Sequence, residues 1–83
     1  MQLLYFGWVR AKTGTSKEDI EVPPDITDVA GLIAHLKSRG DGYQQAFEDI
    51  SAIRVAVDQE MAELDTPIAG ASEVALFPPM TGG

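Results

Sequence analysis

Apolar positions occur along the chain in short runs separated by polar turns, which is typical of a small domain of strands with one main helix. The first run, residues 3–9 (LLYFGWV), is apolar and aromatic throughout and predicts a strand buried on both faces. Residues 10–17 are polar and predict a loop. Ile20 and Val22 then alternate with acidic residues, so residues 18–22 are predicted to form a half-buried second strand.

The clearest helical pattern follows two prolines. Thr27 is the predicted N-cap, Asp28 lies in the first turn, where it suits the helix dipole, and Gly40 is predicted to end the helix. Residues 43–47 are expected to add a short helical turn. The helix presents one apolar stripe at positions i, i+3, i+4 and i+7, formed by Val29, Leu32, Ile33 and Leu36.

Three more strands are predicted over residues 53–57, 60–64 and 73–77, with a hairpin turn at Asp58-Gln59. The resulting order β-β-α-β-β-β predicts an α+β fold of the ubiquitin-like β-grasp type. It has a mixed four- to five-stranded sheet, one main helix packed on one face, and the first and last strands side by side at its centre. The apolar stripe of the helix is expected to pack on Leu3, Tyr5, Val9, Ile20, Val22, Val55, Val74 and Leu76.

The chain ends with six residues that predict chemistry: Pro78, Pro79, Met80, Thr81, Gly82 and Gly83. Two glycines without Cβ atoms can pass through a narrow channel in another protein, and they leave the terminal carbonyl carbon open to attack. The two prolines stiffen the exit from the last strand. Residues 79–83 are therefore interpreted as a flexible tail on one domain that covers residues 1–83. A chance or merely flexible ending is the alternative, which the position directly after a strand disfavours.

A second pattern agrees with the tail. If the helix covers one face of the sheet, the opposite face of its two central strands carries an apolar patch, which is rarely left exposed on a small monomer. Burial by loops, a homodimer, or a register shifted by one residue would also account for it. A partner that grips this patch would receive the tail directly, because the two share the last strand. The predicted patch consists of Leu4, Phe6, Trp8, Ala75 and Phe77.

Composition narrows the classes of function. Six basic against thirteen acidic residues give a net charge of −7, which disfavours binding to nucleic acid or to an anionic membrane. No cysteine is present, so a disulfide, a thiolate metal site and a thiol nucleophile are excluded. His35 is the single histidine and is predicted to be solvated or capping, so no metal site and no bound cofactor are expected. The expected location is the cytoplasm, since no targeting segment is visible.

Four segments resemble the small subunit of molybdopterin synthase, a ubiquitin-like sulfur carrier. They are residues 3–14 (LLYFGWVRAKTG), 27–36 (TDVAGLIAHL), 54–59 (RVAVDQ) and 65–83 (DTPIAGASEVALFPPMTGG). The ending FPPMTGG is the most specific part, because a terminal Gly-Gly alone also occurs in other ubiquitin-like carriers. Asp58 departs from the asparagine usual at this turn in the family, which affects only a hairpin.

The resemblance implies a carrier that is not catalytic on its own. An adenylating enzyme similar to ubiquitin activators would use ATP to adenylate the Gly83 carboxylate, and a sulfur donor protein would convert it to a thiocarboxylate. Inside the large synthase subunit, in an expected heterotetramer, the thiocarboxylate would attack cyclic pyranopterin monophosphate. Two such transfers would build one dithiolene.

The resemblance also implies roles for individual residues. Gly83 is the reactive terminus and Gly82 the channel residue. Phe6 and Phe77 are anchors for the partner, supported by Leu4 and Trp8, and Arg10 at the end of the first strand is expected to pair with an acidic group. The tail contacts are Pro78, Pro79, Met80 and Thr81. Two rival functions stay open: a thiazole carrier or isopeptide-forming modifier, and a plain β-grasp interaction domain.

Overall fold

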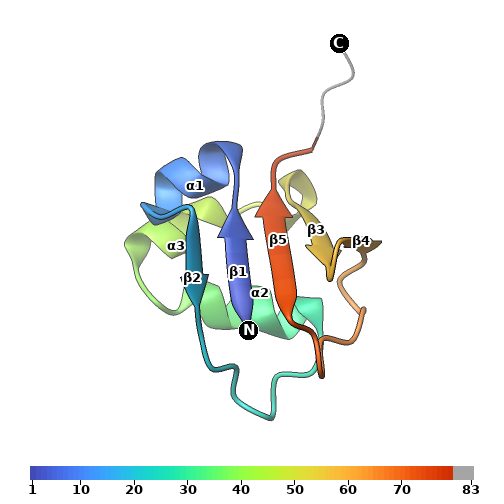
Figure 1. Cartoon of the computed structure of the whole chain (residues 1–83). Helices are drawn as coiled ribbons and strands as arrows, with labels where there is room; N and C mark the ends of the chain where they lie inside the picture. Colours follow the sequence, from blue (N-terminus) through green and yellow to red (C-terminus); the bar gives the residue numbers. More distant parts are fainter. Residues whose placement is uncertain (80–83) are drawn as a thin grey trace.

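The computed structural model describes residues 1–79 and shows one mixed five-stranded sheet. The strands lie in the order β2-β1-β5-β3-β4 (Figure 1). β1 and β5 are parallel and central, and the other neighbours are antiparallel. The predicted pairing of the first and last strands is therefore confirmed. The strand bounds are Gln2–Tyr5 for β1, Lys17–Asp19 for β2, Arg54–Val57 for β3, Glu60–Ala62 for β4 and Glu73–Phe77 for β5.

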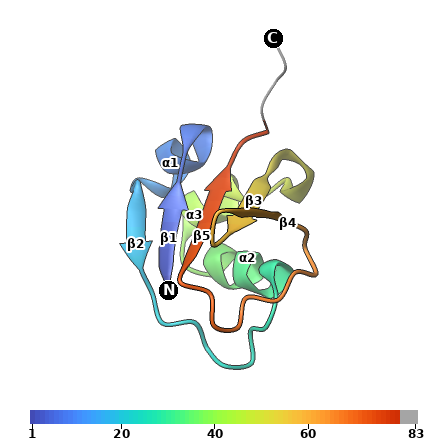
Figure 2. The same cartoon turned by 45° about the vertical axis from the view of Figure 1, so that its right-hand side comes forward.

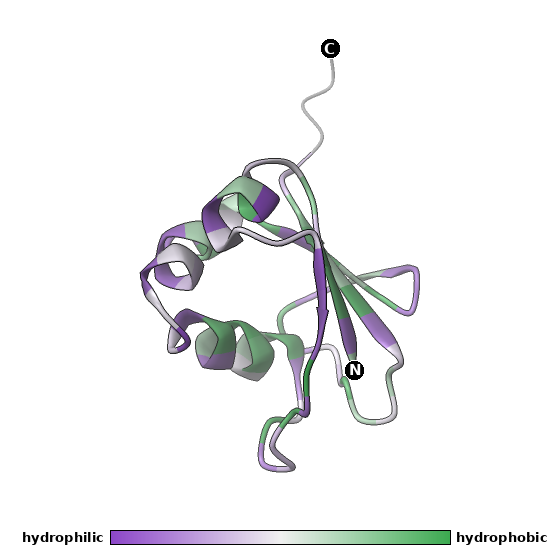
Figure 3. Ribbon diagram, turned by 60° about the vertical axis from the view of Figure 1, so that its left-hand side comes forward, coloured by the Kyte–Doolittle hydropathy of each residue, from purple (hydrophilic) through white to green (hydrophobic). Residues whose placement is uncertain are grey.

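The helices all pack on one face of this sheet, as Figure 2 and the nearly edge-on view in Figure 3 show. The main helix is α2, and much of its ribbon is green, that is hydrophobic, in Figure 3. No helix in residues 1–79 is long and apolar enough to cross a membrane. The helical bounds are Gly7–Thr13 for α1, Val29–Lys37 for α2, Asp41–Ala46 for α3 and Ile50–Ala52 for the 3-10 turn η1.

The core lies between α2 and the sheet, as the stripe predicts. All four stripe residues are fully buried. Of the residues predicted opposite them, Ile20 and Val22 are only partly buried, and the other six lie in the core. The structure adds to the core side chains from α3 and from loops that the predicted packing did not include, namely Ala46, Phe47, Ile53 and Ile68.

The prediction of one strand over residues 3–9 is wrong beyond Tyr5. The strand stops there, and Gly7 begins α1 with a φ of +57°, a conformation that favours glycine. Val9 still enters the core, but from a helix rather than from a strand. The loop predicted over residues 10–17 is accordingly replaced by the rest of α1, the turn after it and the first residue of β2.

Both predicted ends of α2 shift. Asp28, not Thr27, is the N-cap, and its carboxylate accepts a hydrogen bond from the Gly31 amide at 2.8 Å. Ser38 is the C-cap, whereas Gly40 precedes α3. The carboxylate of aspartate caps as well as a threonine hydroxyl, so the sequence alone did not separate the two neighbours.

The hairpin between β3 and β4 forms where predicted. Asp58 and Gln59 have φ values of 49° and 71°, and positive φ at both central residues is characteristic of a type I′ turn. The Asp58 carboxylate also accepts hydrogen bonds from the amides of Ser72 and Glu73 at 2.9 and 3.0 Å. The turn is therefore fixed to the start of β5.

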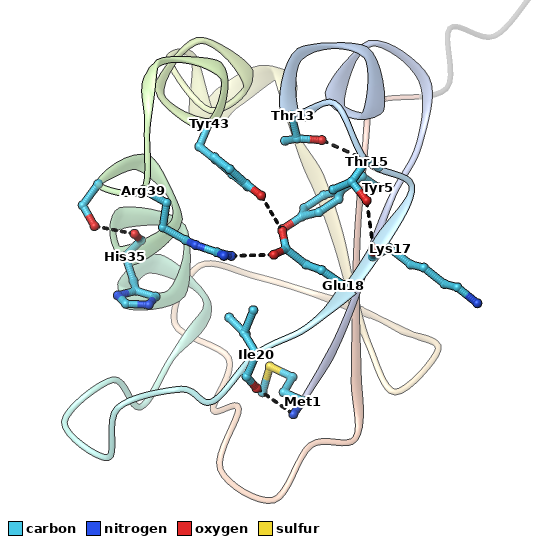
Figure 4. Close-up of polar contacts among 11 residues, drawn as sticks. Met1, Tyr5, Thr13, Thr15, Lys17, Glu18, Ile20, His35, Arg39 and Tyr43 are labelled. Carbon is cyan, nitrogen blue, oxygen red and sulfur yellow. Dashed lines mark hydrogen bonds and ion pairs between the residues drawn. The ribbon is translucent and has the colours of Figure 1, made fainter.

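A polar network joins β2 to the helices (Figure 4). The Glu18 carboxylate accepts hydrogen bonds from Tyr5 at 2.8 Å, from Tyr43 at 2.7 Å and from Arg39 at 2.7 Å. Burial alone would raise the pKa of Glu18, but the hydrogen bonds from both tyrosines and Arg39 outweigh it and hold the pKa below its ordinary value. The short edge strand β2 is thus anchored through one carboxylate to β1, to α3 and to the turn that follows α2.

Candidate functional site

The outer face of the sheet, opposite the helices, carries a row of apolar residues across four strands. Leu4 pairs with Ala75, Ala75 with Ala56, and Ala56 with Met61. Because side chains alternate along a strand, these residues point away from the core that their neighbours Leu3, Val55 and Val74 enter. The row and half-buried Phe77 are called the outer patch: Leu4, Ala56, Met61, Ala75 and Phe77.

The structure confirms an outer apolar face but changes its members. Met61 was missed, although it is 66% exposed and has the largest exposed fraction among the large apolar side chains of residues 1–79. The sequence did hold a signal for the position of Met61. A two-residue hairpin loop at Asp58-Gln59 fixes the register of the two strands, and this register places Met61 opposite Ala56. The patch consequently extends to the edge strand β4.

Phe6 and Trp8 do not lie on a strand, contrary to the prediction. Phe6 is the N-cap of α1 and 49% exposed, and Trp8 lies in the first turn of α1 and is 38% exposed. Because β1 and β5 are parallel, α1 begins at the same end of the sheet at which β5 ends (Figure 1). The two aromatic residues therefore flank the exit of the chain from β5 instead of lengthening the patch.

Arg10 also lies in α1 rather than at the end of the first strand, and it is exposed. The helix forms there because Gly7 turns the chain and Val9, the one buried residue of α1, then enters the core. Arg10 nevertheless remains at the end of the sheet where β5 ends, because α1 is short. Its predicted pairing with a partner is not tested by this position.

The exit of the chain is held by a close contact with the start of α1. The Pro78 ring packs on Gly7 so tightly that a Cβ at Gly7 would lie 2.6 Å from the Pro78 Cγ atom. The Phe6 amide donates a hydrogen bond to the Leu76 carbonyl at 3.2 Å. Pro78 and Pro79 are both half-buried, so the direction in which the chain leaves β5 is set by α1. The predictions for Met80, Thr81, Gly82 and Gly83 lie outside the described residues.

The described residues of the candidate site are mainly apolar. Within residues 1–79, no cluster of three or more histidine or acidic side chains could hold a metal ion. His35 is half-buried on α2, and its carbonyl accepts hydrogen bonds from Ser38. The site is therefore an apolar surface next to an oriented chain exit.

Comparison with known proteins agrees with this geometry. The model of the ThiS family matches residues 3–83. The chain is 36% identical over 83 residues to the molybdopterin synthase sulfur carrier subunit of Escherichia coli K12, covering all of this chain and 99% of that protein. It is 34% identical over 84 residues to the protein of the same name from Mycobacterium tuberculosis H37Rv, with coverage of 100% and 96%.

Solved structures show the same fold. SAMP1 of Haloferax volcanii matches with a TM-score of 0.73 and 25% identity, over 100% of this chain and 98% of that one. A chain in the complex of subunits 1 and 2 of the molybdopterin-converting factor from Helicobacter pylori 26695 matches with a TM-score of 0.63 and 23% identity, over 99% and 96%. The predicted ubiquitin-like β-grasp fold is thus confirmed, and the chain belongs to the ThiS family, within which it resembles the small subunits of molybdopterin synthase over its whole length.

Proposed function

We propose that this chain is the sulfur carrier subunit of a molybdopterin synthase and that the Gly83 carboxyl group carries the sulfur. The observation that supports the proposal best is the arrangement at one end of the sheet. There Phe77 of the outer patch, the aromatic residues Phe6 and Trp8, and the chain exit at Pro78 lie together. A protein that covers the patch would therefore receive the residues that follow Pro79.

The proposed chemistry begins with activation of the carboxylate, which resists nucleophiles. A ubiquitin-activating-type enzyme joins the Gly83 carboxylate to the α-phosphate of ATP, and pyrophosphate leaves. A sulfur donor protein then delivers sulfur at the oxidation level of hydrosulfide to the acyl carbon, where a carbon–sulfur bond forms as the bond to AMP breaks and AMP leaves. Attack by the resulting thiocarboxylate on cyclic pyranopterin monophosphate starts the dithiolene. The carrier supplies the nucleophile, while the partner supplies the pocket and its acid and base groups.

The large synthase subunit is the proposed docking partner of the outer patch. Phe77 is the central anchor, because it is half-buried on the last strand directly before the exit. Leu4 and Met61 extend the contact along the sheet, while Phe6 and Trp8 continue it onto α1. Relatives named as molybdopterin synthase subunits favour this function over a thiazole carrier, a protein modifier or a plain interaction domain.

The carrier function is tested by intact-protein mass spectrometry after incubation with the activating enzyme, ATP and the sulfur donor. The expected product gains the mass of one sulfur-for-oxygen exchange. Deleting Gly83, or adding one residue after it, should abolish the exchange and dithiolene formation. The thermal midpoint should not change, because the buried core ends at Leu76. A truncated chain that still supports dithiolene formation would contradict the proposal.

The docking role is tested separately by calorimetry with the large subunit. Phe77→Ala should weaken binding by about 2 kcal/mol, or roughly 30-fold, if the ring is a buried anchor. Leu64→Ala is the matched control, since Leu64 is 45% exposed but lies outside the outer patch. Equal affinity of wild type and Phe77→Ala would remove Phe77 from the interface.

A further inference from the structure

The charges of the chain are distributed very unevenly. Residues 1–17 contain Arg10, Lys12 and Lys17 and no acidic residue, whereas residues 18–83 contain three basic and all thirteen acidic residues. The net charge of −7 thus combines +3 in the first segment with −10 in the rest. A uniformly solvated acidic surface would not produce this separation.

The fold places the three positive residues beside the proposed docking face. Arg10 and Lys12 are exposed on α1, the helix that flanks the chain exit. Lys17 pairs with Leu4 across β2 and β1, so both side chains lie on the outer face of the sheet. Figure 4 shows the Lys17 side chain pointing away from the network around Glu18. Arg10, Lys12 and Lys17 are called the basic flank.

None of these charges is neutralised within the described part of the chain. The ion pairs in residues 1–79 join Arg39 to Glu18 and the Met1 ammonium to Asp19. Arg10 and Lys12 suit the C-terminal end of α1, an effect worth a few tenths of a kcal/mol at an exposed site. That effect does not account for Lys17, which lies outside the helix and forms no ion pair with Glu18 or Asp19, its described neighbours in β2.

The backbone that carries the basic flank is held by close packing and by hydrogen bonds. Gly42 lets α3 pack directly against α1, since a Cβ there would overlap the Lys12 carbonyl oxygen. In the turn after α1, the Thr13 hydroxyl donates to the Thr15 carbonyl at 3.2 Å and the Thr15 hydroxyl donates to the Lys17 carbonyl at 2.9 Å. Side chains displayed from a fixed backbone lose less freedom on binding, which favours a recognition role.

We propose that the basic flank docks against an acidic surface on the protein that receives the tail. The inference rests on the proposed function, in which the protein that receives the tail is the large synthase subunit. Charges at the rim of an apolar contact chiefly increase the association rate and select the partner. Here they offset the repulsion that the other parts of this acidic chain would exert on an acidic partner. A nucleic acid fits less well, because three cations neutralise few phosphates.

The experiment measures the association rate of the carrier with the large subunit by stopped flow, at about 10 mM and about 1 M salt. Lys12→Glu and Lys17→Glu should each slow association roughly threefold to tenfold at low salt, and the difference should vanish at high salt, where charges are screened. Lys37→Glu is the control, with the same charge change on α2, and should have little effect. Faster association of the variants, or rates equal to that of Lys37→Glu, would overturn the proposal.

A second readout separates this inference from the carrier function. At saturating activating enzyme, Lys12→Glu and Lys17→Glu should still gain the sulfur-for-oxygen mass. Normal association with a normal mass change would therefore overturn the acidic docking surface alone, whereas no mass change in the wild type would overturn the carrier function. Titration with single-stranded RNA should show no binding. Binding that Lys17→Glu abolishes would assign the basic flank to nucleic acid instead.

Discussion

Replacing Glu18 with alanine should remove the link between β2 and the helices. The magnitude follows from the three donors that the carboxylate serves. Tyr5 is 1% exposed, so its hydroxyl would be left without an acceptor in the interior, at a cost of about 1–3 kcal/mol. Tyr43 is half-buried and loses about 1 kcal/mol more, while Arg39 can turn to water. We expect a total loss of about 3 kcal/mol.

That loss would be a large part of the total stability, which for a chain of this length is roughly 4–12 kcal/mol. Urea unfolding followed by circular dichroism measures it directly. Glu21→Ala is the matched control, because Glu21 is exposed and follows β2 closely, and it should change stability by less than about 0.5 kcal/mol.

A double-mutant cycle sharpens the test of the Glu18 network. Tyr5→Phe removes the buried hydroxyl, so Glu18→Ala should cost less in that background than in the wild type. Strictly additive effects would refute the coupling between the two residues. A Glu18→Ala protein within about 0.5 kcal/mol of wild type would refute the reasoning as a whole.

Three further changes test the pH dependence of the Glu18 network, the core under α2 and the turn between β3 and β4. Because the pKa of Glu18 is lowered in the folded state, the contribution of this carboxylate to stability is complete above its ordinary pKa near 4.5 and is lost as pH falls through the folded-state pKa. The Glu18→Gln protein should therefore lose less stability than wild type on acidification, as measured by urea unfolding at a series of pH values. Leu32→Ala should cost about 2–5 kcal/mol in urea unfolding, because Leu32 is fully buried, and an unchanged midpoint would contradict its place in the core. Gln59→Gly should raise the thermal midpoint by an amount equivalent to about 1 kcal/mol, since glycine adopts a φ of 71° without strain, whereas a lower midpoint would argue against the turn geometry.

The sequence predicted those parts of the fold in which hydrophobic period and turn chemistry agree. The apolar stripe on α2 has a strict helical period. The strand β5 begins at an acidic residue and ends before a proline, and successive side chains point to opposite faces, so both elements were predicted with the correct faces. The hairpin turn was found because Asp58 tolerates a positive φ. In each case a local signal and the tertiary contacts favour the same structure.

The prediction for residues 3–9 failed because their hydrophobic pattern is ambiguous. Residues 3–9 are apolar without interruption, and a continuous apolar run does not distinguish a strand from a strand that leads into a helix. The deciding features are the positive φ of Gly7 and its contact with Pro78, which joins the two ends of the described chain. Such a contact depends on the completed fold, so Phe6, Trp8 and Arg10 were assigned to the wrong element.

The central pairing of β1 with β5 has a consequence for biosynthesis. β1 precedes every other strand of the sheet in the chain and β5 follows every other strand, so the middle of the sheet cannot close until β5 has left the ribosome. A nascent chain that stalls before β5 exposes the buried faces of Leu3 and Tyr5 to chaperones and proteases. A chain that lacks β5 therefore cannot bury these side chains, and folding itself selects against it.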